Sequence, residues 1–167
     1  MSILALQERS VSYVKGNQKI KPGQPVRFSD AATIGDYGDQ GDLRIELIND
    51  IGNDESFSYE YHHKDDGLKT KVYKLQNSYN ALLVPGNTIG SNHYLEDAKS
   101  CTIFYPAGWS KDASYEEYEG PILKCHHETT IKHPVHGDVT IPAGNCVFLS
   151  YQRVFDVEQM KERRQLD

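Results

Sequence analysis

The sequence is poor in several features that would each define a class of protein. It has three cysteines, Cys101, Cys125 and Cys146, and no C-x-x-C pair among them. An odd, scattered set predicts free thiols in a reducing compartment, although Cys146 could still neighbour Cys101 or Cys125 on a sheet. No run approaches the roughly 20 apolar residues of a membrane-spanning helix. The first residues do not have the pattern of a secretory signal, so we expect no membrane association.

Basic residues are also in the minority. Eighteen Lys and Arg against 24 Asp and Glu give a formal net charge of −6 at pH 7. Nucleic acids and anionic membrane surfaces attract basic proteins, so this balance argues against both as general partners. Hydrophobic residues make up 38% of the 167 residues and include eleven tyrosines. A chain of this size can bury one core without disulfides or a structural metal.

Short apolar runs separated by turn residues fill most of the chain. Leu43–Ile48 and Phe57–Tyr61 alternate apolar and polar side chains, the pattern of a half-buried strand. Turns rich in Gly, Pro, Asn and Asp recur every 8–12 residues or so, which is typical of a sandwich or barrel. The further predicted strands are Val11–Val14, Lys71–Leu75, Ala81–Val84, Thr102–Tyr105, Ile122–Cys125, Val139–Ile141 and Cys146–Tyr151. Between them, Ile51–Asp66 is polar and predicts a long hairpin or a mobile loop.

The C-terminal segment has a helical pattern instead. Asp156 can cap a helix, Gln159 occupies the capping-box position, and basic residues follow late in the segment. We therefore expect a mainly β fold, an antiparallel sandwich or barrel-like domain with one short C-terminal α-helix. A single domain would span 1–167, with an N-terminal extension or extra strands in 1–37, a core in 38–155 and the helix in 156–166.

Histidine is the residue type that stands out for function. Four of the seven histidines lie between positions 126 and 136, and His133 and His136 flank a turn that contains Pro134. His93 follows another turn. A site built from His93, His133 and His136 would lie on loops held by a sheet, and imidazole both binds metals and transfers protons near neutral pH. The alternative is that these histidines are surface or turn-stabilising residues.

The candidate roles follow from that set. His93, His133 and His136 are candidate ligands of a divalent metal, and with Asp138 they are candidate ligand-binding residues. His133, His136 and Arg153 are candidate catalytic residues. No H-E-x-x-H, EF-hand or G-x-S-x-G motif occurs, so the sequence leaves open whether the chain is an enzyme and which cofactor it uses.

The segment Gly137–Gly144 resembles the second cupin motif, in which a P-x-G turn precedes a metal-binding histidine. Here Val147 stands at the position of that histidine. The cupin ligand is therefore missing, and a plain strand-turn-strand element is the preferred interpretation.

The order of short motifs resembles that of a set of small, poorly characterised phage and bacterial proteins. The matching elements are Gln40-Gly41-Asp42, Gly90 with His93, His133 with His136, Pro142-Ala143-Gly144, and Gln152-Arg153 before Phe155. The resemblance spans roughly residues 38–164. It implies that His93, His133 and His136 share a site, and it implies a phage or mobile-element context.

Two functions compete. The first is a phage or mobile-element accessory or virion-associated protein that acts through contact with a protein partner or by self-assembly, in the host cytoplasm or the virion; small size, acidic surface and abundant Tyr favour it. The second is a small histidine-site enzyme or ligand-binding protein for a phosphate-bearing substrate, metal-assisted or acting by general acid–base chemistry. A nucleic-acid-binding β-barrel is a third, disfavoured by the acidic charge.

Overall fold

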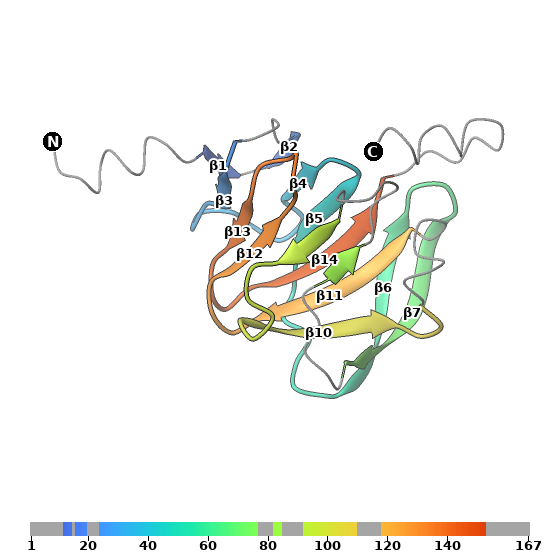
Figure 1. Cartoon of the computed structure of the whole chain (residues 1–167). Helices are drawn as coiled ribbons and strands as arrows, with labels where there is room; N and C mark the ends of the chain where they lie inside the picture. Colours follow the sequence, from blue (N-terminus) through green and yellow to red (C-terminus); the bar gives the residue numbers. More distant parts are fainter. Residues whose placement is uncertain are drawn as a thin grey trace, which may run out of the picture.

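The structure is a computed structural model, and it describes residues 12–14, 16–19, 24–76, 82–84, 92–109 and 118–152. Within these ranges every regular element is a strand (Figure 1). The mainly β fold is therefore confirmed. The predicted helix over 156–166 lies outside the described residues, as does Arg153. No helix in the described ranges is long or apolar enough to cross a bilayer.

The strands form two sheets. They are β1 (Ser12–Val14), β2 (Asn17–Lys19), β3 (Val26–Phe28), β4 (Tyr37–Gln40), β5 (Leu43–Ile48), β6 (Ser56–His63), β7 (Gly67–Leu75), β8 (Leu82–Val84), β9 (His93–Leu95), β10 (Cys101–Pro106), β11 (Glu119–Cys125), β12 (Thr129–Lys132), β13 (Val139–Ile141) and β14 (Cys146–Tyr151). The larger sheet has the order β2-β4-β5-β14-β11-β10-β7-β6, and the smaller has the order β1-β3-β13-β12-β9-β8.

Pairing is antiparallel except near the N-terminus. There β2 runs parallel to β4, and β3 runs parallel to both β1 and β13. The larger sheet curls along its length, so that the β6–β7 hairpin stands steeply to β10 and β11 in Figure 1. The architecture is a two-sheet sandwich whose larger sheet bends toward a half-barrel.

The main core lies between the two sheets. Alternate residues of β5 (Leu43, Ile45 and Leu47) point into it, and β12 and β13 contribute Ile131 and Ile141 from the opposite sheet. This is the two-residue period that the sequence predicted for Leu43–Ile48. Each such side chain stabilises the fold by about 1.5–3 kcal/mol when it leaves water.

A second apolar cluster covers the opposite face of the larger sheet. The rings of Tyr59 and Tyr61 lie 5.2 and 5.4 Å from the ring of Phe148. They reach it because the sheet curls and brings β6 over β14. The polar segment Ile51–Asp66 is thus half loop and half strand: its aromatic residues point inward and its serine and glutamate residues point outward.

Candidate functional site

The histidines of interest lie where the two sheets meet. His93 opens β9, and His133 and His136 lie in the connection that follows β12, all on the smaller sheet. The end of β4 and the turn into β5, on the larger sheet, face them. This turn contributes Gln40 and Asp42. The site therefore joins elements that are far apart in the chain.

The three imidazole rings follow one another in a row, here called the histidine stack, with neighbouring ring planes tilted by 47° and 37°. The centroids of the His93 and His133 rings are 4.5 Å apart, and those of His133 and His136 are also 4.5 Å apart. His93 is 1% exposed and His133 6%, whereas His136 is partly exposed. The structure thus brings together the three histidines that the sequence grouped, with His136 at the surface.

Gln40 ties the two sheets together beneath this stack. Its side chain is fully buried, and its amide nitrogen donates to the carbonyl oxygens of Ile131 (3.0 Å) and Gly137 (2.8 Å). Its amide oxygen lies 2.8 Å from Nδ1 of His93. A buried amide with all these partners is fully satisfied, so it holds the stack in a single arrangement.

The second nitrogen of His93 faces an acid. Nε2 lies 3.2 Å from Oδ1 of Asp42, whose side chain is 13% exposed. Asp42 is further fixed through its backbone, since its carbonyl oxygen accepts the N–H of Gln152 at 2.7 Å. Both nitrogens of His93 are therefore engaged inside the protein.

His133 is held by its own turn. Its Nδ1 accepts the backbone N–H groups of Val135 and His136, both at 3.1 Å. The same hydrogen-bond pattern occurs in the β6–β7 turn, where Nδ1 of His63 accepts the N–H groups of Asp65 (3.1 Å) and Asp66 (3.2 Å). His133 and His136, which the sequence suggested as metal ligands, thus belong to one turn in which the imidazole of His133 accepts two backbone N–H groups.

Gly41 makes room for the stack. Its φ is +62°, and a Cβ built on it would lie 2.5 Å from Nε2 of His136. A side chain at this position would meet both backbone strain and a ring. Gly41 therefore lets the turn between β4 and β5 approach His136 closely.

A shared metal site is not what these contacts form. Among the described residues, no three His, Cys, Asp or Glu side chains are arranged to hold a metal ion. The physical reason is that Nδ1 and Nε2 of His93 and Nδ1 of His133 already have partners within the fold. The divalent-metal interpretation of His93, His133 and His136 finds no support here.

The remaining sequence candidates are placed as follows. The carboxylate of Asp138 lies 3.7 Å from Nζ of Lys132, which also lies 3.7 Å from Oε1 of Glu96. The Pro-Ala-Gly segment is a turn between β13 and β14, with Gly144 at φ +87° and Val147 fully buried in the core. The cupin-like segment is thus a strand-turn-strand element in which position 147 packs rather than binds.

The sequence missed two members of the site. Gln40 and Asp42 appear in the sequence analysis only as part of the motif Gln40-Gly41-Asp42, although both side chains hydrogen-bond to His93. A signal existed, because Gln40-Gly41-Asp42 belongs to the same ordered set of motifs as the histidines. What no pattern showed is that the first of these motifs folds against the others.

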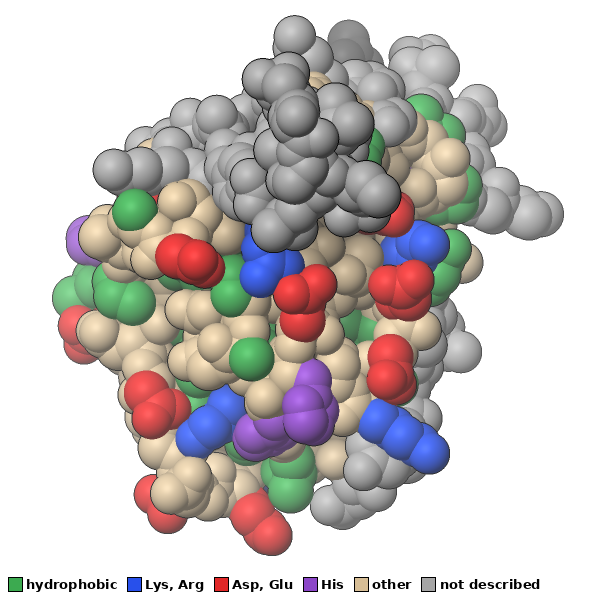
Figure 2. All heavy atoms as spheres, turned by 90° about the vertical axis from the view of Figure 1, so that its left-hand side faces the viewer, with side chains coloured by type: hydrophobic (Ala, Val, Ile, Leu, Met, Phe, Trp, Pro, Cys, Tyr) green, Lys and Arg blue, Asp and Glu red, His purple; other side chains and the backbone are tan. Residues whose placement is uncertain are grey.

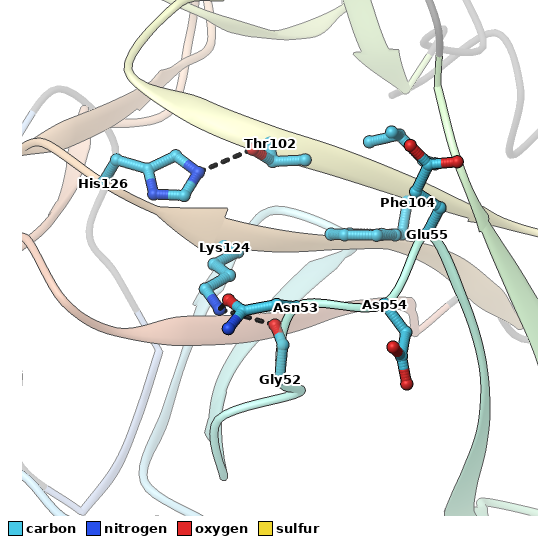
Figure 3. Close-up of a pocket in the computed structure, with 9 residues that line it drawn as sticks. Gly52, Asn53, Asp54, Glu55, Thr102, Phe104, Lys124 and His126 are labelled. Carbon is cyan, nitrogen blue, oxygen red and sulfur yellow. Dashed lines mark hydrogen bonds between the residues drawn. The ribbon is translucent and has the colours of Figure 1, made fainter.

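A separate hollow of about 240 Å³ lies near the start of β10 and the end of β11 (Figure 3). The loop Gly52–Glu55 forms one wall, and Thr102, Phe104 and His126 form the other. Nζ of Lys124 contacts the carbonyl oxygen of Gly52, Oδ1 of Asn53 at 3.2 Å and Oδ1 of Asp50 at 3.2 Å. An ammonium group has three N–H donors, so Lys124 holds the loop in place and has no donor left for a ligand.

Charges on the outer face of the smaller sheet are mixed. Figure 2, which views the molecule from the left-hand side of Figure 1, shows acidic and basic side chains interspersed, with no continuous basic area among the coloured side chains. Arg27 on β3 contacts Glu128 at 2.6 Å, and Lys132 on β12 lies between two acids. Pairing of this kind suits a solvated surface and does not provide the continuous basic area that binds nucleic acid.

The thiols are free, as the sequence predicted. Cys101 and Cys125 are directly opposite each other on β10 and β11, and all three cysteines are buried. Burial raises the pKa of both Cys101 and Cys125 to about 12. A thiol that stays protonated is a poor nucleophile, so Cys125 beside His126 is a core residue.

Comparison of the chain with protein-family models, with characterised proteins and with solved structures gives no significant match.

Proposed function

We propose that the chain binds and acts on a small phosphate-bearing ligand at the histidine stack, with His136 as the group that meets the ligand. The observation that carries the proposal is the stack itself: neighbouring imidazole centroids lie 4.5 Å apart, from His93 to His133 and from His133 to His136, and His93 is also paired with Asp42. Burying ionisable side chains makes a protein less stable than an apolar core would. Buried ionisable clusters therefore occur mainly at functional sites.

The proposed chemistry is general acid–base catalysis. Imidazole near neutral pH exchanges protons readily, and charged imidazole hydrogen-bonds strongly to phosphate oxygens. Hydrolysis would use His136 as the base: the water oxygen bonds to phosphorus as one water proton moves to His136, the ester P–O bond breaks, and the leaving oxygen takes a proton from solvent and departs as an alcohol. Arg153, implied by the motif order and outside the described residues, remains a candidate partner of the phosphate.

The test is a titration of the ¹⁵N-labelled protein with inorganic phosphate, followed through the histidine ring signals. We expect the His136 ring to shift most and saturably, and His136→Ala to abolish saturation. His127→Ala is the matched control, because His127 is exposed on the loop after β11. Equal shifts in wild type and His136→Ala would contradict the proposal.

A second candidate function, contact with a protein partner in a phage or mobile-element setting, is favoured by a different observation. The larger sheet overhangs the smaller one, because no residue of β6 or β7 belongs to the inter-sheet core. On β7, Leu68 is 57% and Val72 43% exposed. Leu68 and Val72 are four residues apart on β7, so they lie on the same face of the strand, and a partner that covers this face would bury both.

That candidate is tested by Leu68→Lys/Val72→Lys, which replaces the apolar pair without touching the core. Light scattering of wild type and variant over a concentration series measures self-association. We expect the variant to be less associated if this face joins copies of the chain. Identical mass at every concentration would remove self-assembly through this face.

A further inference from the structure

We infer that the open edge of β6 binds an extended segment of a partner protein as an added antiparallel strand, and that this segment carries two adjacent basic residues. One of them faces Glu60 and the other faces Glu46. The histidine stack and its phosphate chemistry play no part in this contact, which uses the backbone of β6, the surface beneath its edge and the charges on either side.

The edge formed by β6 is long and regular. β6 ends the larger sheet, next to β7, and has eight residues (Figure 1). The other strands that end a sheet in the described part, β1, β2 and β8, have three residues each. Proteins usually keep edge strands short or protect them with proline, lysine or a bulge. β6 contains no proline or lysine and pairs with β7 without a register shift, so it offers a template for another strand.

Half of the backbone groups of β6 point away from β7. The amide N–H of Leu75 donates to the carbonyl oxygen of Glu55 at 2.8 Å, so these two residues form a hydrogen-bonded pair. In an antiparallel ladder, such pairs alternate with pairs whose N–H and C=O groups point outward. The residues of β6 in the outward-pointing pairs are Ser56, Ser58, Glu60 and His62. Their backbone groups form the open edge.

One group of this edge has a neighbour in the fold. The hydroxyl of Tyr118 donates to the carbonyl oxygen of His62 over 3.4 Å. A carbonyl oxygen has two lone pairs, so this one can accept a second hydrogen bond from an added strand. The contact with Tyr118 is therefore compatible with strand addition.

The edge of β6 points toward the space over β5. The hydroxyl of Tyr73 on β7 donates to the carbonyl oxygen of Gly120 on β11 at 2.9 Å, which places β7 over β11. The ring of Tyr59 lies 5.2 Å from that of Phe148, which places β6 over β14. In the larger sheet β5 follows β14. A strand added to β6 would therefore lie over β5.

Glu46 is the acid on β5 that such a strand meets. It is directly opposite Phe148 on β14, so its side chain is on the same face of the sheet as the aromatic cluster. This side chain is half-buried, and burial raises the pKa of its carboxyl group, although the charge of Arg44 lowers it. Arg44 donates to both carboxylate oxygens of Asp39, at 2.8 and 3.0 Å. Its charge is thus shared with Asp39, and a basic side chain over β5 would stabilise the ionised form of Glu46.

Glu60 is the acid on the outer face of β6, where it is exposed. In an antiparallel pair, the residue opposite Glu60 shares two backbone hydrogen bonds with it and has its side chain on the same face. The next residue of the added strand is opposite Tyr59 and points to the inner face. Burial and, after it, the charge of Glu46 raise the pKa of Tyr59, so Glu46 lies close to this inner position.

Two adjacent basic residues therefore match the two acids, one on each face of the added strand. The formal net charge of −6 at pH 7 favours a basic segment as well, since opposite charges speed the encounter of two partners. Backbone hydrogen bonds along an edge supply affinity in strand addition, and side chains on the two faces supply specificity.

The charge assignment is tested by fluorescence anisotropy with a labelled peptide, Ser-Val-Thr-Lys-Arg-Thr-Val-Ser, blocked at both ends. We expect saturable binding, weakened about two- to fivefold in Glu60→Gln and at least as much in Glu46→Gln. Asp30→Asn removes an exposed acid in the turn after β3 and is the matched control, which should bind like wild type. A peptide with Glu-Glu in place of Lys-Arg should not bind. Absence of saturable binding of the Lys-Arg peptide to wild type would overturn the inference, as would equal binding by all three variants.

N-methylated peptides distinguish strand addition from simple attraction between charges. Methyl groups on one alternating set of peptide amides remove the donors that face β6 and should abolish binding. Methyl groups on the other set point away from β6 and should leave most of it. Equal affinity of the two methylated peptides would rule out an added strand.

A second copy of the chain is the competing occupant of this edge. Light scattering and amide hydrogen exchange of the unliganded protein over a concentration series test it. We expect a monomer in which the amides of Glu60 and His62 exchange quickly at every concentration and become protected when the Lys-Arg peptide is added. Dimerisation that protects these two amides without peptide would overturn the assignment of the edge to a partner protein.

Discussion

At the scale of the residue, Gly41 is the position that most directly links the chain to the stack. Its positive φ of +62° is one constraint, and the imidazole of His136, 2.5 Å from a hypothetical Cβ, is a second. Gly144 has the same kind of backbone, φ +87°, with nothing within 4 Å of a Cβ. A side chain at position 144 would therefore meet backbone strain alone, whereas a side chain at position 41 would meet both backbone strain and a steric clash with His136.

We predict that Gly144→Ala destabilises the protein by about 1–2 kcal/mol, the cost of a left-handed alanine. Gly41→Ala should cost more and should also shift the His136 ring signals, because the ring must move away. Urea unfolding and histidine ring spectra measure the two effects. Equal stability losses with an unchanged His136 would show that the ring does not pack on Gly41.

The cysteines give a second prediction at this scale. Burial raises the pKa of Cys101 and Cys125 to about 12, and it also raises the pKa of Cys146. We expect no reaction of the native protein with Ellman's reagent over an hour at pH 8, and three thiols per chain in 6 M guanidinium. Rapid release of even one equivalent from the native protein would show a cysteine that is accessible.

The residue scale also shows what a sequence can say about a site. Clustering and turn residues were enough to select His93, His133 and His136, because histidine is uncommon and its spacing is visible. The motif Gln40-Gly41-Asp42 marks its own segment but does not show that Gln40 and Asp42 contact His93. Their roles depend on contacts between distant parts of the chain. Gln40, for example, hydrogen-bonds to Ile131 and Gly137, which follow it by 91 and 97 positions. No local pattern encodes such contacts.

At the scale of the element, the β6–β7 hairpin is anchored by a buried acid. The hydroxyl of Tyr61 donates to Glu119, whose side chain is 6% exposed, and Nζ of Lys71 lies 3.5 Å from the other carboxylate oxygen. Glu119 lies at a register shift between β11 and β14. These contacts help to hold the hairpin in the curl that brings Tyr59 and Tyr61 over Phe148.

This anchor predicts a pH dependence. Burial by itself would raise the pKa of Glu119, but the hydrogen bond from Tyr61, a backbone N–H and the charge of Lys71 lower it overall. A lowered folded-state pKa means that the ionised acid stabilises the fold above its unfolded value of about 4.3. That contribution is lost as the pH falls through the folded-state pKa.

We therefore expect Glu119→Gln to be destabilised at pH 7 and to lose less further stability than wild type between pH 5 and pH 2.5. Tyr61→Phe should cost about 1.5–3 kcal/mol at pH 7, the value of a hydrogen bond to a charged group. The control is Glu60→Gln, which changes an exposed acid on the outer face of β6. Parallel pH profiles for Glu119→Gln and Glu60→Gln would contradict the assignment.

The elements also divide into those that the sequence could and could not predict. Leu43–Ile48, Val139–Ile141 and Cys146–Tyr151 have the predicted bounds, because a clear alternation or a long apolar run marks them. The strands β2, β3, β4, β9 and β12 were not predicted. They have three or four residues each. β4 reads Tyr-Gly-Asp-Gln, a turn by composition, and is a strand because β5 pairs with all four residues.

At the scale of the whole molecule, the central strand β14 contributes side chains to both apolar clusters. β14 pairs with β5 on one side and β11 on the other. Its neighbouring residues Phe148 and Leu149 point to opposite faces of the larger sheet: Leu149 into the core between the sheets, and Phe148 into the aromatic cluster under β6. The two clusters thus have a common backbone, although they share no side chain.

This arrangement predicts a single cooperative unfolding transition. Leu149→Ala should cost about 2–5 kcal/mol and Phe148→Ala about 3–5 kcal/mol, the usual range for large-to-small changes in a buried core. Because each change loosens the strand that supports both clusters, far-UV and near-UV circular dichroism should report the same midpoint in each variant. If Phe148→Ala instead lost its near-UV signal before its far-UV signal, the β6–β7 hairpin and its aromatic cluster would be a separate unit. The histidine stack lies on the inter-sheet side, so its ring spectra should then persist after the aromatic cluster has melted.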